Sequence, residues 1–318
     1  MDESGAEMDL LVRAMTLESE GVLSVILEAP DGGPLPPWEQ GAHLELELGG
    51  RLRHYSLCGT PGDSSRYRIA VLREPDSRGG SAHVHEVLRP GHLITARGPR
   101  NRFPLVAAER YLFIAGGIGI TPLLPMIAAV EAAGIPWRLA YGGRRRASMA
   151  FQAELAAYGQ AATLLPEDEC GRMDLDTLLG TPQAGTAVYC CGPEGLLSAV
   201  ESVCAAWPEG SLHVERFAAA PRAEVDADDE RDFEVVCRQS DVRVTVPRDL
   251  PIIDALEEVG VWVASACREG ICGSCETKVV EGEPDHRDSL LTPEERASGA
   301  TMMPCVSRSL SDRLVLDL

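Results

Sequence analysis

The sequence predicts a multidomain chain: an antiparallel β-barrel, then an α/β domain with a parallel sheet, then a smaller α+β domain. Short β-like runs separated by turn residues fill residues 10–105, strand-like and helical runs alternate over 106–217, and four spaced cysteines follow in the last segment. Strands alone are typical of a barrel, whereas strands that alternate with helices are typical of a doubly wound parallel sheet. The length of 318 residues fits two or three domains.

The first predicted domain, residues 1–105, is the barrel. Its β-like runs are bounded by turn residues and lie at 23–27, 43–48 and 67–72. A further strand, Arg53-His54-Tyr55-Ser56-Leu57, offers a cation, a ring and a hydroxyl, with Arg53 and Tyr55 on one face. The turn Ser77-Arg78-Gly79-Gly80-Ser81 has amides and a hydroxyl that suit a phosphate. Each motif alone is more often an exposed strand or a hairpin turn.

The second predicted domain, residues 106–217, is the α/β domain with a parallel sheet. Strand-like runs alternate with helical runs; the strands lie at 111–115, 137–141 and 187–190 and the helices at 122–133 and 195–206. Residues 111–130 carry no charge and are long enough to be mistaken for a membrane span. Their glycines and prolines instead predict a buried strand, a turn and a buried helix.

Two strand ends of this domain carry turns suited to a dinucleotide. The first, GGIGITP at 116–122, brings backbone N–H groups and a helix N-terminus to one point, as a pyrophosphate requires. It lacks the full GxGxxG spacing, so a tight turn needed only for packing is the alternative. The second ends another strand at the same edge of the sheet. The candidate residues are Gly116, Gly117, Ile118, Gly119, Thr121, Pro122, Cys191, Gly192 and Pro193.

An acidic segment, residues 218–232, precedes the third predicted domain. It is poor in large apolar side chains, so we expect an exposed linker. Within residues 233–318, a helical run at 252–259 lies among β-like runs at 233–237, 242–246 and 314–316 and predicts an α+β domain. The sequence Thr292-Pro293-Glu294-Glu295 matches a capping box with proline at the first helical position, so a short helix should begin there.

Four cysteines of the last domain have the spacing of an iron-sulfur site. They form C-x4-C-x2-C followed by a fourth cysteine after 29 intervening residues, the plant-type [2Fe-2S] pattern, and are Cys267, Cys272, Cys275 and Cys305. Small residues around the first three allow backbone amides to approach the sulfurs. Zinc usually takes two CxxC-like pairs, and only Cys272 and Cys275 form one here. A zinc site or scattered structural cysteines are the alternatives, and one-electron transfer is the leading hypothesis.

The composition excludes several classes of partner. A net charge of −20 and a pI of about 4.7 argue against nucleic acid or an anionic membrane, because both repel an acidic surface. The acidic N-terminus lacks the pattern of a signal peptide, so we expect a cytoplasmic protein. Ten cysteines, most of them in apolar strand-like or helix-like contexts, fit reduced thiols better than a disulfide framework.

The motifs RHYS, RGGS, GGIGITP and CCGP, followed by the plant-type cysteines, together resemble the phthalate dioxygenase reductase family, which includes the vanillate demethylase reductases. The resemblance covers nearly the whole chain, in the order flavin, pyridine nucleotide, iron-sulfur. It implies an FMN-binding barrel, an NAD(P)H-binding domain and a β-grasp-like ferredoxin domain. The implied function is the reductase component of a multicomponent oxygenase, which passes electrons from NAD(P)H through FMN to a [2Fe-2S] cluster.

The same resemblance implies roles for single residues. The flavin would lie at Arg53, Tyr55 and Ser56, with its phosphate near Gly79, Gly80 and Ser81. The glycine turn at 116–122 would bind the nicotinamide dinucleotide. The catalytic candidates are Ser56 and Cys191, which would orient flavin and nicotinamide rather than transfer protons. Phe217 resembles an aromatic residue that packs near the flavin just before the linker.

The expected partner is a terminal Rieske-type oxygenase, and a cytochrome P450 is the alternative. A second class of hypothesis is a non-catalytic [2Fe-2S] electron carrier or redox sensor, against which the intact flavin and nucleotide motifs argue. The run Arg144-Arg145-Arg146 departs from a clean NADH signature, because a cation there can meet a 2′-phosphate; a solvated arginine run is the other reading. The resemblance favours NADH over NADPH. We expect a monomer with no nucleic-acid or membrane partner.

Overall fold

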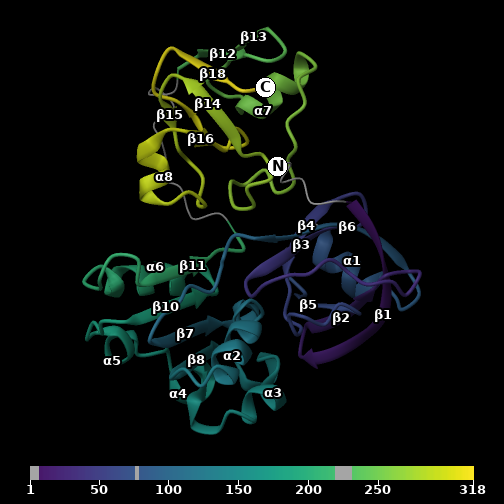
Figure 1. Cartoon of the computed structure of the whole chain (residues 1–318), viewed down its shortest axis with the longest axis vertical. Coiled ribbons are helices and arrows are strands. Elements are labelled where there is room, and N and C mark those ends of the chain that lie inside the picture. Colours follow the sequence, from purple (N-terminus) through teal and green to yellow (C-terminus); the bar gives the residue numbers. More distant parts are fainter. Residues whose placement is uncertain (1–6, 76–78, 219–230) are drawn as a thin grey trace. The chain divides into compact units, whose positions relative to one another are not determined.

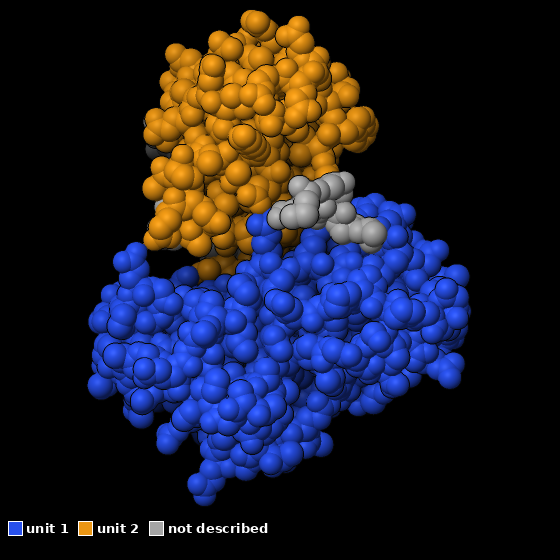
Figure 2. Space-filling view, in the orientation of Figure 1, with its two compact units in different colours: residues 1–215 blue, residues 216–318 orange. Residues whose placement is uncertain are grey.

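The computed structural model describes residues 7–75, 79–218 and 231–318 (Figure 1). The chain divides into two compact units, residues 1–215 and 216–318 (Figure 2). Most of the predicted acidic linker, the N-terminal residues 1–6, and Ser77 and Arg78 of the predicted phosphate turn lie outside the described residues.

The first half of unit 1 is the antiparallel barrel. Its sheet has the strand order β4-β3-β6-β1-β2-β5, and a bridge between Leu57 and Ile69 joins the two ends of that order. Leucine and isoleucine side chains such as Leu44, Leu46 and Ile69 fill the interior. The elements are β1 (Glu7–Ser19), β2 (Val22–Glu28), β3 (Ala42–Glu47), β4 (Leu52–Ser56), β5 (Tyr67–Leu72), α1 (Gly80–Glu86) and β6 (Leu93–Asn101).

The second half of unit 1 is the parallel α/β domain, with strand order β11-β10-β7-β8-β9. Helix α2 packs on one face through Leu123 and Met126, and α6 packs on the other through Leu197 and Val200. The strands are β7 (Arg110–Gly116), β8 (Trp137–Gly143), β9 (Ala162–Pro166), β10 (Thr186–Cys191) and β11 (Leu212–Glu215). The helices are η1 (Gly117–Ile120), α2 (Leu123–Ala132), η2 (Arg146–Ser148), α3 (Gln152–Ala156), η3 (Gly159–Ala161), α4 (Glu167–Cys170), α5 (Leu175–Leu179) and α6 (Glu194–Cys204).

The uncharged stretch 111–130 forms a buried strand, a turn and a buried helix, as predicted. No helix in the described part of the chain is both long and apolar enough to cross a membrane. The barrel and the α/β domain pack directly on each other, since Cys58 and Ala70 of the barrel share a core with Leu123. Arg68 of β5 also pairs with Glu154 of α3, at 2.6 Å. These contacts fix the barrel against the carboxyl ends of the parallel strands.

Unit 2 is a small α+β domain of the β-grasp type. Its main sheet has the order β13-β12-β18-β14-β16, in which β12 and β18 run parallel and the other pairs antiparallel. Helix α7 covers this sheet through Ile252, Ile253 and Leu256. The elements are β12 (Phe233–Cys237), β13 (Val242–Val246), α7 (Ile252–Glu258), β14 (Thr277–Glu281), β15 (Pro284–Asp285), α8 (Pro293–Ser298), β16 (Thr301–Met302), β17 (Arg308–Ser309) and β18 (Arg313–Leu316).

The predicted capping box at the start of α8 is confirmed. The Thr292 hydroxyl accepts a hydrogen bond from the Glu295 N–H at 3.2 Å, and the Glu295 carboxylate accepts one from the Thr292 N–H at 2.8 Å. These two bonds satisfy N–H groups that a helix start otherwise leaves without partners. The helix therefore begins where the sequence pattern predicts.

Candidate cofactor sites

The RHYS strand and the glycine turn of the barrel lie against each other. A Cβ atom placed on Gly80 would stand 2.6 Å from Cγ of Arg53, and one on Gly79 would stand 3.3 Å from Nε of Arg51. Gly79 has φ of +100°, a conformation that favours glycine, and Gly80 begins α1. Two arginines thus flank a turn that leads into a helix. Cations, turn amides and a helix start are the groups that bind phosphate.

Arg51 is absent from the sequence prediction, because nothing in its local sequence separates it from an exposed hairpin arginine. Only the contact with Gly79 brings it to the turn. Ser81 lies where predicted, in the first turn of α1, and its hydroxyl accepts a hydrogen bond from the Glu74 N–H at 3.2 Å.

Successive side chains of β4 point to opposite faces of the sheet. Tyr55 packs against the barrel core, and burial raises its pKa to about 12, so the ring stays neutral at physiological pH. Ser56 is buried, and its hydroxyl lies 3.5 Å from Oε2 of Glu215 at the end of β11. The strand therefore offers a ring to one side and a hydroxyl to the α/β domain on the other.

Glu215 is a half-buried carboxyl group that the sequence analysis missed. It lies opposite Cys191 in the register of β10 and β11, so Ser56, Cys191 and Glu215 come together from three strands. Burial raises the pKa of Glu215 to about 8, and the hydrogen bond with the Ser56 hydroxyl lowers this pKa by a smaller amount. The available signal was a carboxyl group at the last position of a short strand-like run, Leu212-His213-Val214-Glu215. A carboxyl group with such a pKa can hold or release a proton near neutral pH.

Cys191 is fully buried at the end of β10. Burial raises the pKa of its thiol well above the ordinary value, and the neighbouring Glu215 raises it further. The sulfur is therefore a neutral thiol and no nucleophile, because only the thiolate attacks.

The two predicted nucleotide turns are in direct contact. A Cβ atom on Gly192 would stand 2.9 Å from Cα of Gly116, and one on Gly119 would stand 2.2 Å from the carbonyl oxygen of Cys191. A Cβ atom on Gly116 would meet Pro193 at 2.6 Å. No residue with a side chain fits at these three glycines without displacing backbone. The structure thus joins the two strand ends into one cradle.

The rest of the first turn leads into α2. Gly117 has φ of +55°, and a Cβ atom there would meet nothing within 4 Å. The Thr121 hydroxyl donates to the Ile118 carbonyl at 3.0 Å, and Pro122 is the residue that caps α2. Gly117 therefore faces open space beside backbone amides, which suits close approach of a ligand.

The other predicted positions are placed as follows. Phe217 belongs to unit 2, and 42% of its surface is exposed. Arg145 pairs with Glu20 at 2.7 Å, and Arg146 pairs with Glu169 through two contacts of 2.6 and 2.8 Å. Two of the three arginines that could meet a 2′-phosphate thus have carboxylate partners.

The four predicted ligand cysteines of unit 2 meet as two pairs. The thiols of Cys267 and Cys272 share a hydrogen bond, and the sulfurs of Cys275 and Cys305 are 3.3 Å apart. Among the described residues, no three His, Cys, Asp or Glu side chains are grouped so as to hold one metal ion. Two thiols for each of two irons is the ligand arrangement of a [2Fe-2S] cluster, whereas structural zinc takes four ligands around one ion. The donor set therefore fits the cluster better than zinc.

Backbone amides already surround these sulfurs. The hydrogen bond with Cys272 lowers the pKa of the Cys267 thiol, and the N–H groups of Ile271, Glu269 and Cys272 lower it further. The Ser274 hydroxyl lies 3.0 Å from the Cys272 sulfur and accepts a bond from the Ala266 N–H. Such donors stabilise thiolates, the form that binds iron. The loop is thus arranged for metal ligation.

An arginine of the same loop fastens it to α7. Arg268 has φ of +56°, which is rare for a residue with a side chain. Its guanidinium pairs with Asp254 at 2.5 Å and with Glu257 at 2.6 Å. These two ion pairs offset the backbone cost and hold the loop on the helix.

The comparisons with known proteins agree with this geometry. The family model for the 2Fe-2S iron-sulfur cluster binding domain matches residues 235–310, which include all four cysteines. Phenoxybenzoate dioxygenase subunit beta of Ectopseudomonas oleovorans is 42% identical over 318 residues, with 98% of each chain covered.

Two solved structures resemble the chain over 98% of its length. An intact type IV self-sufficient cytochrome P450 monooxygenase gives a TM-score of 0.93 at 44% identity, and the chain spans 41% of that protein. Phthalate dioxygenase reductase, described as a modular structure for electron transfer from pyridine nucleotides to [2Fe-2S], gives a TM-score of 0.72 at 34% identity, with 98% of that chain covered.

Proposed function

The chain belongs to the phthalate dioxygenase reductase family, and we propose that it is the NAD(P)H-dependent reductase component of a multicomponent oxygenase. Bound to these residues, FMN would supply the conversion of a two-electron hydride into single electrons, and a [2Fe-2S] cluster on the four cysteines would supply one-electron transfer. The observation that carries the proposal is the cradle in which the glycine turns of β7 and β10 meet beside Ser56 and Glu215. Residues predicted for the nucleotide and for the flavin therefore lie next to each other, which supports the proposal.

The barrel residues bind and orient the flavin. Arg51 and Arg53, which lie beside Gly79 and Gly80, would donate hydrogen bonds to the flavin phosphate. A guanidinium group can bind two phosphate oxygens at once. Tyr55 offers a neutral ring to the flavin. Ser56 would direct its hydroxyl to the flavin, and Glu215, 3.5 Å from that hydroxyl, could hold a proton near neutral pH.

The α/β domain binds the dinucleotide. The amides of residues 117–121 and the start of α2 hold the pyrophosphate. Cys191, kept neutral by burial, would orient the nicotinamide without placing a charge beside it. We also propose NADH as the preferred donor, because Arg145 and Arg146 are engaged by glutamates. A KM for NADPH well above that for NADH is expected, and equal values would contradict this preference.

The proposed partner is a terminal Rieske-type oxygenase, as the dioxygenase relatives suggest. A cytochrome P450 is the second candidate, because the chain is 44% identical to two fifths of a self-sufficient P450. Mixing the reduced protein with each class of terminal component separates the two, since only the true partner should oxidise it rapidly. We further propose a monomer in the cytoplasm, a compartment that suits the ten free cysteines.

Replacing one ligand cysteine tests the order of electron transfer. Cys272→Ser should abolish reduction of cytochrome c by NADH, because the single-electron exit is lost. Reduction of ferricyanide, which accepts electrons directly from the flavin, should remain close to that of the wild type. Cys170→Ser, at an exposed cysteine on α4, is the control and should change neither rate. Equal loss of both activities in folded Cys272→Ser would refute the order, and full retention of both would refute the cluster assignment.

A further inference from the structure

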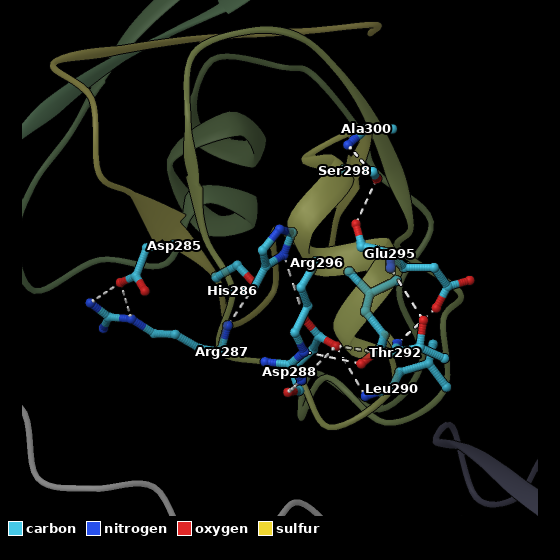
Figure 3. A network of polar contacts seen from close by, with 12 residues as sticks. Asp285, His286, Arg287, Asp288, Leu290, Thr292, Glu295, Arg296, Ser298 and Ala300 are labelled. Carbon is cyan, nitrogen blue, oxygen red and sulfur yellow. Dashed lines mark hydrogen bonds and ion pairs between the residues drawn. The ribbon is translucent and has the colours of Figure 1, made fainter. Parts of the chain in front are cut away.

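A buried carboxylate lies next to the cysteine loop and belongs to none of the proposed cofactor sites. Asp288 lies between β15 and α8, and its side chain is fully buried. Its Oδ2 accepts hydrogen bonds from the N–H groups of Leu290 and Leu291, at 3.0 and 2.8 Å. Figure 3 shows this carboxylate at the centre of a polar network. The two bonds close a tight turn of the kind that aspartate favours.

Arg296 of α8 braces the same turn. Its guanidinium donates to the backbone carbonyl of Asp288, donates to the carbonyl of Leu291 at 3.0 Å, and lies 3.5 Å from Oδ2 of Asp288 (Figure 3). The helix that carries Arg296 is itself fixed by the capping box at Thr292. Arg296 therefore holds the turn through both the side chain and the backbone of Asp288.

This turn rests on Gly270, which lies between the ligand positions Cys267 and Cys272. The N–H of Ser289 donates to the Gly270 carbonyl at 2.9 Å. A Cβ atom on Gly270 would stand 2.9 Å from Cα of Asp288 and 2.6 Å from Cγ2 of Val306. Gly270, with φ of +71°, is thus pressed between the Asp288 turn and the neighbour of Cys305.

Gly270 also lies next to a ligand position, because it packs against Val306, the neighbour of Cys305. Its backbone N–H is one of the groups that lower the pKa of the Cys305 thiol, and the Cys305 sulfur lies 3.3 Å from the sulfur of Cys275. Hydrogen bonds to ligand sulfurs tune the reduction potential of an iron-sulfur cluster. A donor N–H stabilises the extra negative charge of the reduced cluster, so it raises the potential. The path from Asp288 to the sulfur involves only contacts between neighbouring groups.

We propose that Asp288 is a positioning residue for the cluster: it fixes the turn 288–291, holds Gly270 with its N–H on the Cys305 sulfur, and so raises the reduction potential. The inference rests on the proposed function, in that it requires a cluster on the four cysteines. It assigns Asp288 a geometric role. A purely electrostatic role has the opposite sign, since a buried negative charge near the cluster lowers the potential and its removal raises it.

A series of neutral substitutions separates geometry from charge. Asp288→Asn, Asp288→Ser and Asp288→Ala all lack the charge, but their ability to accept bonds from the turn falls in that order. The midpoint potential of the cluster, measured by spectroelectrochemistry on the full-length holoprotein, should therefore fall from Asn to Ser to Ala. The electron paramagnetic resonance signal of the reduced cluster should change along the same series. Equal potentials across the three would overturn the proposal.

Asp285 provides the matched control. It lies three residues before Asp288, and its carboxylate pairs with Arg287 at 2.6 Å. Asp285→Asn and Asp285→Ala should have the same potential as each other; a difference as large as that in the Asp288 series would contradict the specific role of Asp288.

Cluster loading keeps the outcomes distinct. Iron and sulfide are counted in every variant, and if Asp288→Ala fails to hold a cluster, the Asn and Ser variants decide the question. A wild-type protein without a [2Fe-2S] signal, or with one that NADH does not reduce, would count against the proposed function. A fully loaded wild type with a flat Asp288 series would count against this inference alone.

Discussion

At the scale of single residues, the central feature is a protonated carboxyl group between the two domains of unit 1. Glu215 contacts the Ser56 hydroxyl and lies opposite Cys191, and burial gives it a pKa of about 8 instead of 4.5. Cys191 beside it stays a thiol for the same reason. Both groups are therefore neutral at the proposed site of hydride transfer, where Glu215 can hold a proton.

The raised pKa of Glu215 predicts how stability varies with pH. The folded state holds this proton more tightly than the unfolded chain, so its stabilising effect is complete below about pH 4.5 and is lost as the pH rises through about 8. The melting temperature of the wild type should fall between pH 6 and pH 8. In Glu215→Gln, the free energy of unfolding should vary less with pH than in the wild type, by up to about 1.4 kcal/mol per pH unit.

Glu209→Gln is the control for this experiment. Glu209 is exposed, so its replacement should leave the wild-type pH dependence intact. Circular dichroism melts of the three proteins at both pH values provide the measurement. An unchanged slope in Glu215→Gln would show that the carboxyl group titrates normally.

At the scale of elements, the proposed nucleotide site depends on turns that meet across the parallel sheet. The strands β7 and β10 are neighbours, and this adjacency brings Gly116 and Gly119 against Gly192 and Cys191. The glycines permit backbone contact at the carboxyl edge of the sheet, where open α/β folds bind ligands. The packing between turns thus explains glycine positions that lack the full GxGxxG spacing.

A methyl group at one of these glycines should damage the site. Gly119→Ala would place a Cβ atom 2.2 Å from the Cys191 carbonyl oxygen, so backbone must shift. We expect a loss of about 1–3 kcal/mol in stability and a marked rise in the KM for NADH. Gly195→Ala, in α6 with nothing within 4 Å, is the matched control and should be close to neutral. Thermal melts and steady-state kinetics of both variants check this, and an unaltered Gly119→Ala would contradict the cradle.

The sequence predicted much of this architecture, because local patterns determine it. The alternation of strands with helices, the capping box at Thr292 and the uncharged stretch 111–130 all formed the expected elements. The 13-residue strand β1 was missed, since two register shifts, at 12–14 and 17–19, interrupt its alternating pattern. Arg51, Glu215 and Asp288 were also missed. Their importance comes from partners distant in sequence, which no local pattern records.

At the scale of the whole molecule, the two main features are the net charge of the chain and its division into two compact units. The chain carries a net charge of −20 and comprises two compact units, one with the flavin and nucleotide motifs and one with the cysteines. An acidic protein attracts a basic electron acceptor and repels an anionic one, and salt screens both effects. The surface charge should therefore influence which acceptors react quickly.

Ionic strength should affect two artificial acceptors in opposite directions. Reduction of cytochrome c, a basic protein, should slow as the salt concentration rises, because salt screens the electrostatic attraction between the two proteins. Reduction of ferricyanide, a small anion, should hold steady or accelerate, because repulsion is screened. Steady-state rates between low and physiological salt provide the test. Slowing of both acceptors alike would point to an effect of salt on the enzyme itself.

The most direct test of the central claim is an anaerobic titration of the purified full-length protein with NADH, followed by visible absorption. The account predicts that the flavin band and the thiolate-to-iron bands of the cluster both bleach as NADH is added. Flavin reduction with a cluster that stays oxidised would contradict the path from flavin to cluster. A cluster without any flavin would contradict the reductase function and favour a simple electron carrier or redox sensor.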